Sequence, residues 1–218
     1  MLFKNKNILV LAAHPDDETL GCGATIKKLS ELENNIHLVT FTNGLGARNI
    51  VGNRNNKIPD VANFLGIGKY NHANFPDNEM DTVSLLKVVQ YINSTVDYVP
   101  DVIFTHHNDC LNIDHHIVYR ATLTAFRPQF GDKTQIYSYY VPSSTDYNPL
   151  NNFDGNVYFD VVGYEDYKIQ CLKKYYSKEM REYPHTRSIQ NIENLMKVWG
   201  SEIGIKYAEK FQLIRNVF

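Results

Sequence analysis

Two short clusters of histidine and carboxylate residues carry most of the chemistry that this sequence offers. The first is the run His14-Pro15-Asp16-Asp17-Glu18. Imidazole and carboxylate groups are good zinc ligands, and a short turn can aim His14 and one aspartate at the same point. Adjacent carboxylates repel each other, and a divalent cation offsets that repulsion. The run therefore predicts one metal ligand and one catalytic base among its two aspartates.

The second cluster is the segment Thr105–His116, which contains four histidines and two aspartates. A catalytic zinc usually has three protein ligands and one open position, so His14 and one aspartate need a single further donor. We expect His115 to supply it. The two clusters together predict a metal site made of two histidines and one aspartate.

The neighbours of His115 have supporting roles in this prediction. Asp114 or Asp109 can accept a hydrogen bond from the second ring nitrogen of a metal-bound histidine, as carboxylates commonly do. His106 can simply end a strand, and His116 lies one step around a helix from His115. Because a three-ligand site cannot use every nearby imidazole, we expect His106 and His116 to be structural.

A simpler interpretation of the first cluster needs no metal. Asp16 or Asp17 can cap a helix that begins near Thr19, because aspartate is favoured at helix N-termini. His14 would then fill a surface turn. The presence of a second cluster rich in ligand residues favours the metal site over this capping interpretation.

Hydrophobic runs place both clusters at the ends of strands. Ile8–Ala13 is a continuous apolar run, typical of a strand buried on both faces, and it leads into the first cluster. Asp101–Thr105 predicts another strand, which leads into the second. In open α/β sheets ligands bind outside the carboxyl ends of the strands. Both clusters are therefore expected in a functional position.

Strands and helices alternate through the first 126 residues. The patterns predict further strands over 36–41 and 70–75, and helices over 19–33, 48–65, 81–96 and from about 113 onward. Asp81 or Thr82 is the expected N-cap of the helix over 81–96. This alternation favours an α/β fold, a Rossmann-like three-layer sandwich with a mostly parallel sheet.

The last third of the chain has softer patterns. They predict strands over 135–141 and 157–161, helices over 165–181 and 188–200, and a closing strand or tail over 211–215. The loop over 142–155, rich in Ser, Asn and Asp, is long enough to indicate a functional lip. No Pro/Gly/Ser-rich linker interrupts the pattern, so we expect one domain over residues 1–218.

Composition narrows the class of protein. The net charge of −2 and pI near 6.4 give no broad basic field, which argues against a nucleic-acid partner. The N-terminal apolar run is too short for a signal sequence or a membrane span, so a cytoplasmic protein without membrane insertion is expected. Three widely separated cysteines without a Cys-x-x-Cys motif indicate neither a disulfide framework nor a cysteine zinc cluster.

The two clusters resemble the paired motifs of the PIG-L, or LmbE-like, family of zinc-dependent N-deacetylases. The first family motif is similar to the stretch 13–18 and the second to the stretch 107–115. Other stretches with a family resemblance are Phe75-Pro76-Asp77-Asn78, Ser143-Ser144-Thr145, Glu179-Met180-Arg181, Pro184-His185 and Arg187-Ser188. The resemblance thus extends over nearly the whole chain.

This resemblance implies a division of roles within the first cluster. Zinc would be bound by His14, Asp17 and His115, one ion per chain, although other divalent ions suit the same donors. Asp16 would be the general base that activates the attacking water. Some family members carry a histidine where this chain has Asn112, and there it is thought to help hold the oxyanion. Asn112 can donate a hydrogen bond but cannot carry a proton.

The resemblance therefore leaves two candidates for the acid that protonates the leaving group, whereas it implies one residue as the base. Asp16, once protonated, can serve, and His185 is a second candidate. Asp114 is expected to assist catalysis beside Asn112. The Asn form resembles the branch that acts in bacterial surface-polysaccharide and sugar-antibiotic pathways, which implies an N-acetylated sugar, free or nucleotide-linked, as substrate.

Several polar residues are expected to bind that substrate. They are Arg48, Arg54, Asp109, His185 and Arg187. Two rival functions remain open on the sequence: a zinc hydrolase of an ester or a non-sugar amide, and a metal- or nucleotide-binding module without catalysis. A homo-oligomer is compatible with the sequence but not specified by it.

Overall fold

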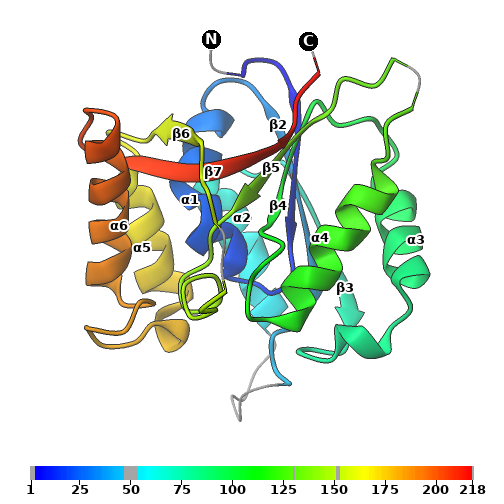
Figure 1. Ribbon diagram of the computed structural model, residues 1–218, viewed down its shortest axis with the longest axis horizontal. Coiled ribbons are helices and arrows are strands. Elements are labelled where there is room, and N and C mark those ends of the chain that lie inside the picture. Colours follow the sequence, from blue (N-terminus) through cyan, green and yellow to red (C-terminus); the bar gives the residue numbers. More distant parts are fainter. Residues whose placement is uncertain (1–2, 47–53, 130, 151–152, 218) are drawn as a thin grey trace.

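A seven-stranded sheet forms the centre of the computed structural model, which describes residues 3–46, 54–129, 131–150 and 153–217 (Figure 1). The strand order is β3-β2-β1-β4-β5-β7-β6. The strands are β1 (Asn7–Ala12), β2 (Asn35–Thr42), β3 (Lys69–Phe75), β4 (Val102–His106), β5 (Gln135–Tyr139), β6 (Val157–Asp160) and β7 (Ala208–Arg215). The first five are mutually parallel, and β7 runs antiparallel to both β5 and β6. The predicted mostly parallel α/β sheet is confirmed.

Helices cover both faces of this sheet (Figure 1). One face carries α1 (Asp17–Ser30), α2 (Ile58–Leu65), α5 (Glu165–Tyr175) and α6 (Ile189–Glu202), and the other carries α3 (Leu85–Thr95) and α4 (Ile113–Ala125). Side chains alternate along a strand, so Ile8 and Val10 of β1 pack toward the first group while Leu9 and Leu11 pack toward the second. Burial on both faces explains the continuous apolar run of β1.

Some predicted boundaries are wrong. The N-cap of α3 is Ser84, not Asp81 or Thr82, because Met80–Thr82 forms a short 3-10 turn and Val83 is extended before the helix begins. The predicted helix over 165–181 ends at Tyr175, where the backbone of Tyr176 leaves the helical conformation.

Other predicted elements differ in extent. Within the stretch 48–65 the structure describes a 3-10 turn, Arg54–Lys57, followed directly by α2. The closing strand is longer than predicted, since β7 begins at Ala208. Among the described residues, no helix is both long enough and apolar enough to cross a bilayer.

Candidate metal and active site

The two histidine clusters meet at the carboxyl edge of the sheet. β1 lies between β2 and β4, so the chain crosses over in opposite directions on either side of it. Such a switch point is where open α/β sheets bind ligands. The first cluster follows β1, while the second begins at the end of β4 and continues into α4 (Figure 1). Parallel pairing of β1 with β4 therefore brings His14 and His115 together, 101 residues apart in sequence.

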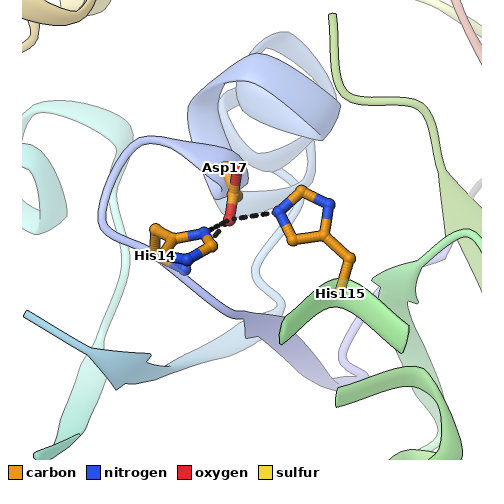
Figure 2. A group of neighbouring side chains, drawn as sticks. All are labelled: His14, Asp17 and His115. Carbon is orange, nitrogen blue, oxygen red and sulfur yellow. Dashed lines mark hydrogen bonds and ion pairs between the residues drawn. The ribbon is translucent and has the colours of Figure 1, made fainter. Parts of the chain in front are cut away.

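Asp17 joins the two histidines (Figure 2). Its Oδ2 atom lies 3.0 Å from Nδ1 of His14 and 3.3 Å from Nε2 of His115. All three side chains are buried. Tetrahedral zinc with nitrogen and oxygen ligands separates its donor atoms by roughly 3.4 Å, so the spacing fits a zinc ion. The structure brings together the three residues that were predicted as metal ligands.

The other ring nitrogen of His14 faces two more carboxylates. Nε2 lies 3.1 Å from Asp114 Oδ2 and 3.2 Å from Asp77 Oδ1. His14, Asp77 and Asp114 thus form a second set of potential ligands. Their carboxylates are already engaged, because Asp114 accepts hydrogen bonds from the backbone N–H groups of Asn78 and Met80, and Asp77 accepts one from the Thr42 hydroxyl. This set is better suited to orient the His14 ring than to hold an ion.

The charges around His14, Asp17 and His115 favour the binding of a cation. Burial lowers the pKa of His14, but the negative charges of Asp17, Asp114 and Asp77 outweigh it and raise the value to about 10. Burial lowers the pKa of His115, whose ring therefore offers a lone pair at neutral pH. Burial raises the pKa of Asp17, yet the surrounding imidazoles bring it well below its ordinary value. Asp17 is charged, and a cation can replace the proton on His14.

Proton release should accompany metal binding. A His14 pKa of about 10 means that the metal-free protein holds this proton at neutral pH, and coordination through Nδ1 must displace it. We expect release of about one proton per zinc ion, with the apparent affinity falling about tenfold for each unit that the pH drops below 7. Calorimetric titration at pH 6 and 7, in buffers of different ionisation enthalpy, measures this number. Binding without proton release would show that His14 is not a ligand.

His106 packs against His115, one of the predicted metal ligands. It is the last residue of β4, its ring stacks on that of His115 with centroids 3.8 Å apart, and its Nε2 accepts a hydrogen bond from the N–H of Ala13. The hydroxyl of Tyr139 lies 3.2 Å from the same nitrogen. Stacking of His106 on His115 restricts the orientation of that ring, and a structural role for His106 stays a prediction. His116, outside the cluster, contacts the carbonyl of Cys110.

Asp16 directly precedes Asp17, one of the predicted metal ligands, and is 1% exposed. One of its oxygens, Oδ2, accepts a hydrogen bond from Nη1 of Arg187 at 3.3 Å. Although Asp16 precedes α1, its side chain makes no capping hydrogen bond to that helix. The capping interpretation of Asp16 is therefore wrong, and its carboxylate is directed toward Arg187 instead.

The remaining predicted residues lie around this centre. Asn112 caps α4, accepting from the N–H of Asp114 and donating to Oδ1 of Asn78. The side chain of Asp109 pairs with Asn108, and Nδ1 of His185 accepts from the N–H of Arg187. Of the other two predicted arginines, Arg48 lies outside the described residues, and Arg54 is described only as the first residue of a 3-10 turn.

Sequence reasoning did not assign a role to some residues that the structure places at this site. They include Asp77, Glu18, Tyr139 and Tyr176. Asp77 could have been predicted from its position, because it follows the carboxyl end of β3, a strand parallel to β1 and β4. The tyrosines could not, because aromatic residues in strands and helices are usually part of the core.

Comparisons with known proteins identify the family of this chain. Residues 9–126 match the family model PIG-L, described as GlcNAc-PI de-N-acetylase. The uncharacterized deacetylase YaiS of Escherichia coli (strain K12) is 31% identical over 148 residues, which cover 65% of this chain and 77% of YaiS.

Two solved structures share the fold at low sequence identity. The N,N'-diacetylchitobiose deacetylase of Pyrococcus horikoshii superposes with a TM-score of 0.77 at 19% identity, covering 96% of this chain and 84% of its own. GalB, the 4-carboxy-2-hydroxymuconate hydratase of Pseudomonas putida KT2440, gives 0.70 at 17% identity, covering 98% of each chain. The fold alone thus accommodates more than one reaction. The family match and the YaiS relationship decide between them: the chain belongs to the PIG-L family and is a deacetylase, an amidohydrolase.

Proposed function

We propose that the protein removes the N-acetyl group of an amino sugar, free or nucleotide-linked, and releases the free amine and acetate with the help of a bound zinc ion. The observation that carries this proposal is the position of Asp16. It is a buried carboxylate next to three converging metal donors, yet it is not one of them. A base adjacent to a metal site is what hydrolysis of an unactivated amide needs.

The chain's own residues divide the work of hydrolysis. His14, Asp17 and His115 would hold the ion, which supplies Lewis acidity to polarise the amide carbonyl and acidify a nearby water. Asp16 accepts the proton of the water as its oxygen attacks the carbonyl carbon. The tetrahedral adduct then collapses with cleavage of the C–N bond, and the departing nitrogen takes a proton from Asp16 or from His185.

We assign to Asn112 the stabilisation of the negative oxygen of the tetrahedral adduct. A side-chain amide nitrogen carries two N–H bonds, so Asn112 can donate one to Asn78 and the other to substrate. Preorganised donors of this kind stabilise the transition state because they need no reorientation during the reaction. Asp114 fixes this arrangement, since its backbone N–H holds Oδ1 of Asn112 while its carboxylate holds His14.

A polar hollow that reaches the site at Asp77 suits a sugar. It has a volume of about 480 Å³, lies between the loops after β2 and β3, and is lined in part by Asn43, Asn74, Asp77 and Glu79. Amide and carboxylate groups pair well with sugar hydroxyls. We propose that the predicted residues Asp109, His185 and Arg187 also bind the substrate, while Arg48 and the side chain of Arg54 lie outside the described part of the chain. The diacetylchitobiose specificity of the Pyrococcus enzyme and the GlcNAc-PI description of the family support an N-acetylated sugar.

A substrate panel tests the proposal. Metal-loaded protein is incubated with N-acetylated sugars, free and nucleotide-linked, and with ester and non-sugar amide controls, and acetate and free amine are both quantified. We expect equal amounts of the two products from at least one N-acetylated sugar, with loss of turnover in chelator and recovery on adding zinc. Turnover of the esters or non-sugar amides alone would contradict the sugar assignment. A chain that binds zinc but releases no acetate from any sugar would contradict the proposed reaction.

A further inference from the structure

The backbone of Asp16 adopts a conformation that L-amino acids rarely take. Its φ is 130° and its ψ is −28°. Such a conformation is strained for a residue with a Cβ atom, and it persists only where surrounding contacts hold it. Strain at the proposed base is informative, because the turn at this position decides where both aspartates of the first cluster point. Something in the structure must hold residue 16 in place.

Glu18 supplies one of the holding contacts. Its Oε2 atom accepts a hydrogen bond from the backbone N–H of Asp16 at 3.0 Å. Its Oε1 atom accepts two more, from the hydroxyl of Thr19 at 2.7 Å and the hydroxyl of Tyr176 at 2.8 Å. The Glu18 side chain is fully buried. It is not among the metal donors, and the proposed reaction leaves it without a chemical step.

Tyr176 brings this support from a distant part of the chain. It directly follows α5, lies 158 residues after Glu18, and is 2% exposed. The backbone of Tyr176 is not helical, so α5 ends at Tyr175. The hydroxyl of Tyr176 donates to Glu18. Packing of α5 against α1 fixes the distance between the two residues. Tyr176 lies beyond residues 9–126, the part of the chain that matches the family model.

We propose that Glu18 and Tyr176 are positioning residues for the base: Tyr176 orients the Glu18 carboxylate, which clamps the strained backbone of Asp16 and so aims its side chain at the reacting water. This inference rests on the proposed function, because it assigns the role of the base to Asp16. Arg187 holds the Asp16 carboxylate from its other end. Two segments of the C-terminal third thus act on Asp16: Tyr176 acts on its backbone through Glu18, and Arg187 acts on its side chain directly.

Substitution of Tyr176 by Phe removes one hydroxyl and retains the packed ring. We expect Tyr176→Phe to lower kcat about 2- to 10-fold, the factor that corresponds to one net hydrogen bond, with KM and zinc content close to those of the wild type. Tyr137→Phe is the matched control, since its buried ring also donates one hydroxyl hydrogen bond, to Gln135, away from the site. Equal kcat values for the two variants would overturn the proposal.

A double-mutant comparison tests whether Tyr176 acts through Glu18. Glu18→Gln retains an oxygen that can accept from Asp16 but changes the partner that faces Tyr176. In the Glu18→Gln background, the Tyr176→Phe change should lower kcat by a smaller factor than in the wild type, because the two residues share one contact. Equal factors in both backgrounds would show that Tyr176 does not act through Glu18.

A crystallographic comparison separates this inference from the proposed reaction, because it needs no substrate. Glu18→Leu keeps most of the buried volume and removes the acceptor. We expect the φ of residue 16 to turn negative in this variant and Asp16 to leave Arg187, while zinc-loaded wild-type crystals retain the positive φ. An unchanged Asp16 backbone in Glu18→Leu would overturn the proposal that Glu18 holds that backbone in place. A wild-type protein with the clamp but no acetate release would instead overturn the proposed function. If Glu18→Leu fails to fold, the Tyr176→Phe kinetics decide.

Discussion

Asp16→Asn should retain the metal and lose about 10²- to 10⁴-fold in kcat, the contribution typical of a general base. The change preserves the shape of the side chain. It also preserves the backbone N–H that donates a hydrogen bond to Glu18. It removes the only property that the proposed reaction requires of this residue, the ability to take a proton from water. Inductively coupled plasma mass spectrometry measures the metal content of the variant, and steady-state acetate release measures its kcat.

Two outcomes would contradict this division of roles. Full activity in Asp16→Asn would show that Asp16 is not the base. Loss of metal from the variant would show that Asp16 is a ligand. A matched control is Asp60→Asn, which makes the same chemical change on the exposed surface of α2. It should leave metal content and kcat at the wild-type level.

Loss of His115 should have the other large effect, on the metal itself. His115→Gln removes one of three donors, and the remaining pair, His14 and Asp17, cannot hold zinc tightly. We expect the zinc affinity to fall by more than the roughly 10- to 100-fold that follows loss of a residue that only orients a ligand. Acetate release should fall to background unless zinc is added in excess.

The next residue provides the control for this experiment. His116 lies on the same helix, and its ring contacts the Cys110 carbonyl instead of Asp17. His116→Gln should keep one zinc per chain. If both variants kept their zinc, or if both lost it to the same degree, His115 would not be the third ligand.

The parts of the site that were predictable are those that local sequence determines. A buried strand has an unmistakable apolar run, and the residues after β1 and β4 must lie at its carboxyl edge once the sheet is parallel. His14, His115 and one of the two aspartates could be brought together on that basis and on their donor chemistry, and the family resemblance implied that this aspartate is Asp17. The helices of the first half follow from the same periodicity, although Ser84 replaced the expected N-cap of α3 because a 3-10 turn precedes the helix.

The residues that hold the ligands and the base were not predictable in this way. Asp77 reaches His14 from the end of β3, and Tyr176 and Arg187 reach Glu18 and Asp16 from the C-terminal third. Such contacts depend on how α5 and the loop before α6 pack on α1, and packing of this kind leaves no periodic signal in the chain. Arg187 was expected to bind substrate, and in the structure its guanidinium contacts Asp16.

The position of the bound ion is the most direct measurement. Crystals loaded with zinc and measured at the zinc absorption edge give an anomalous peak that identifies the ligands without any assumption about substrate. We predict one peak per chain, bonded to Nδ1 of His14, a carboxylate oxygen of Asp17 and Nε2 of His115, with Asp16 outside the coordination sphere. A peak on the other side of the His14 ring, bonded to Nε2 and the carboxylates of Asp77 and Asp114, would contradict it.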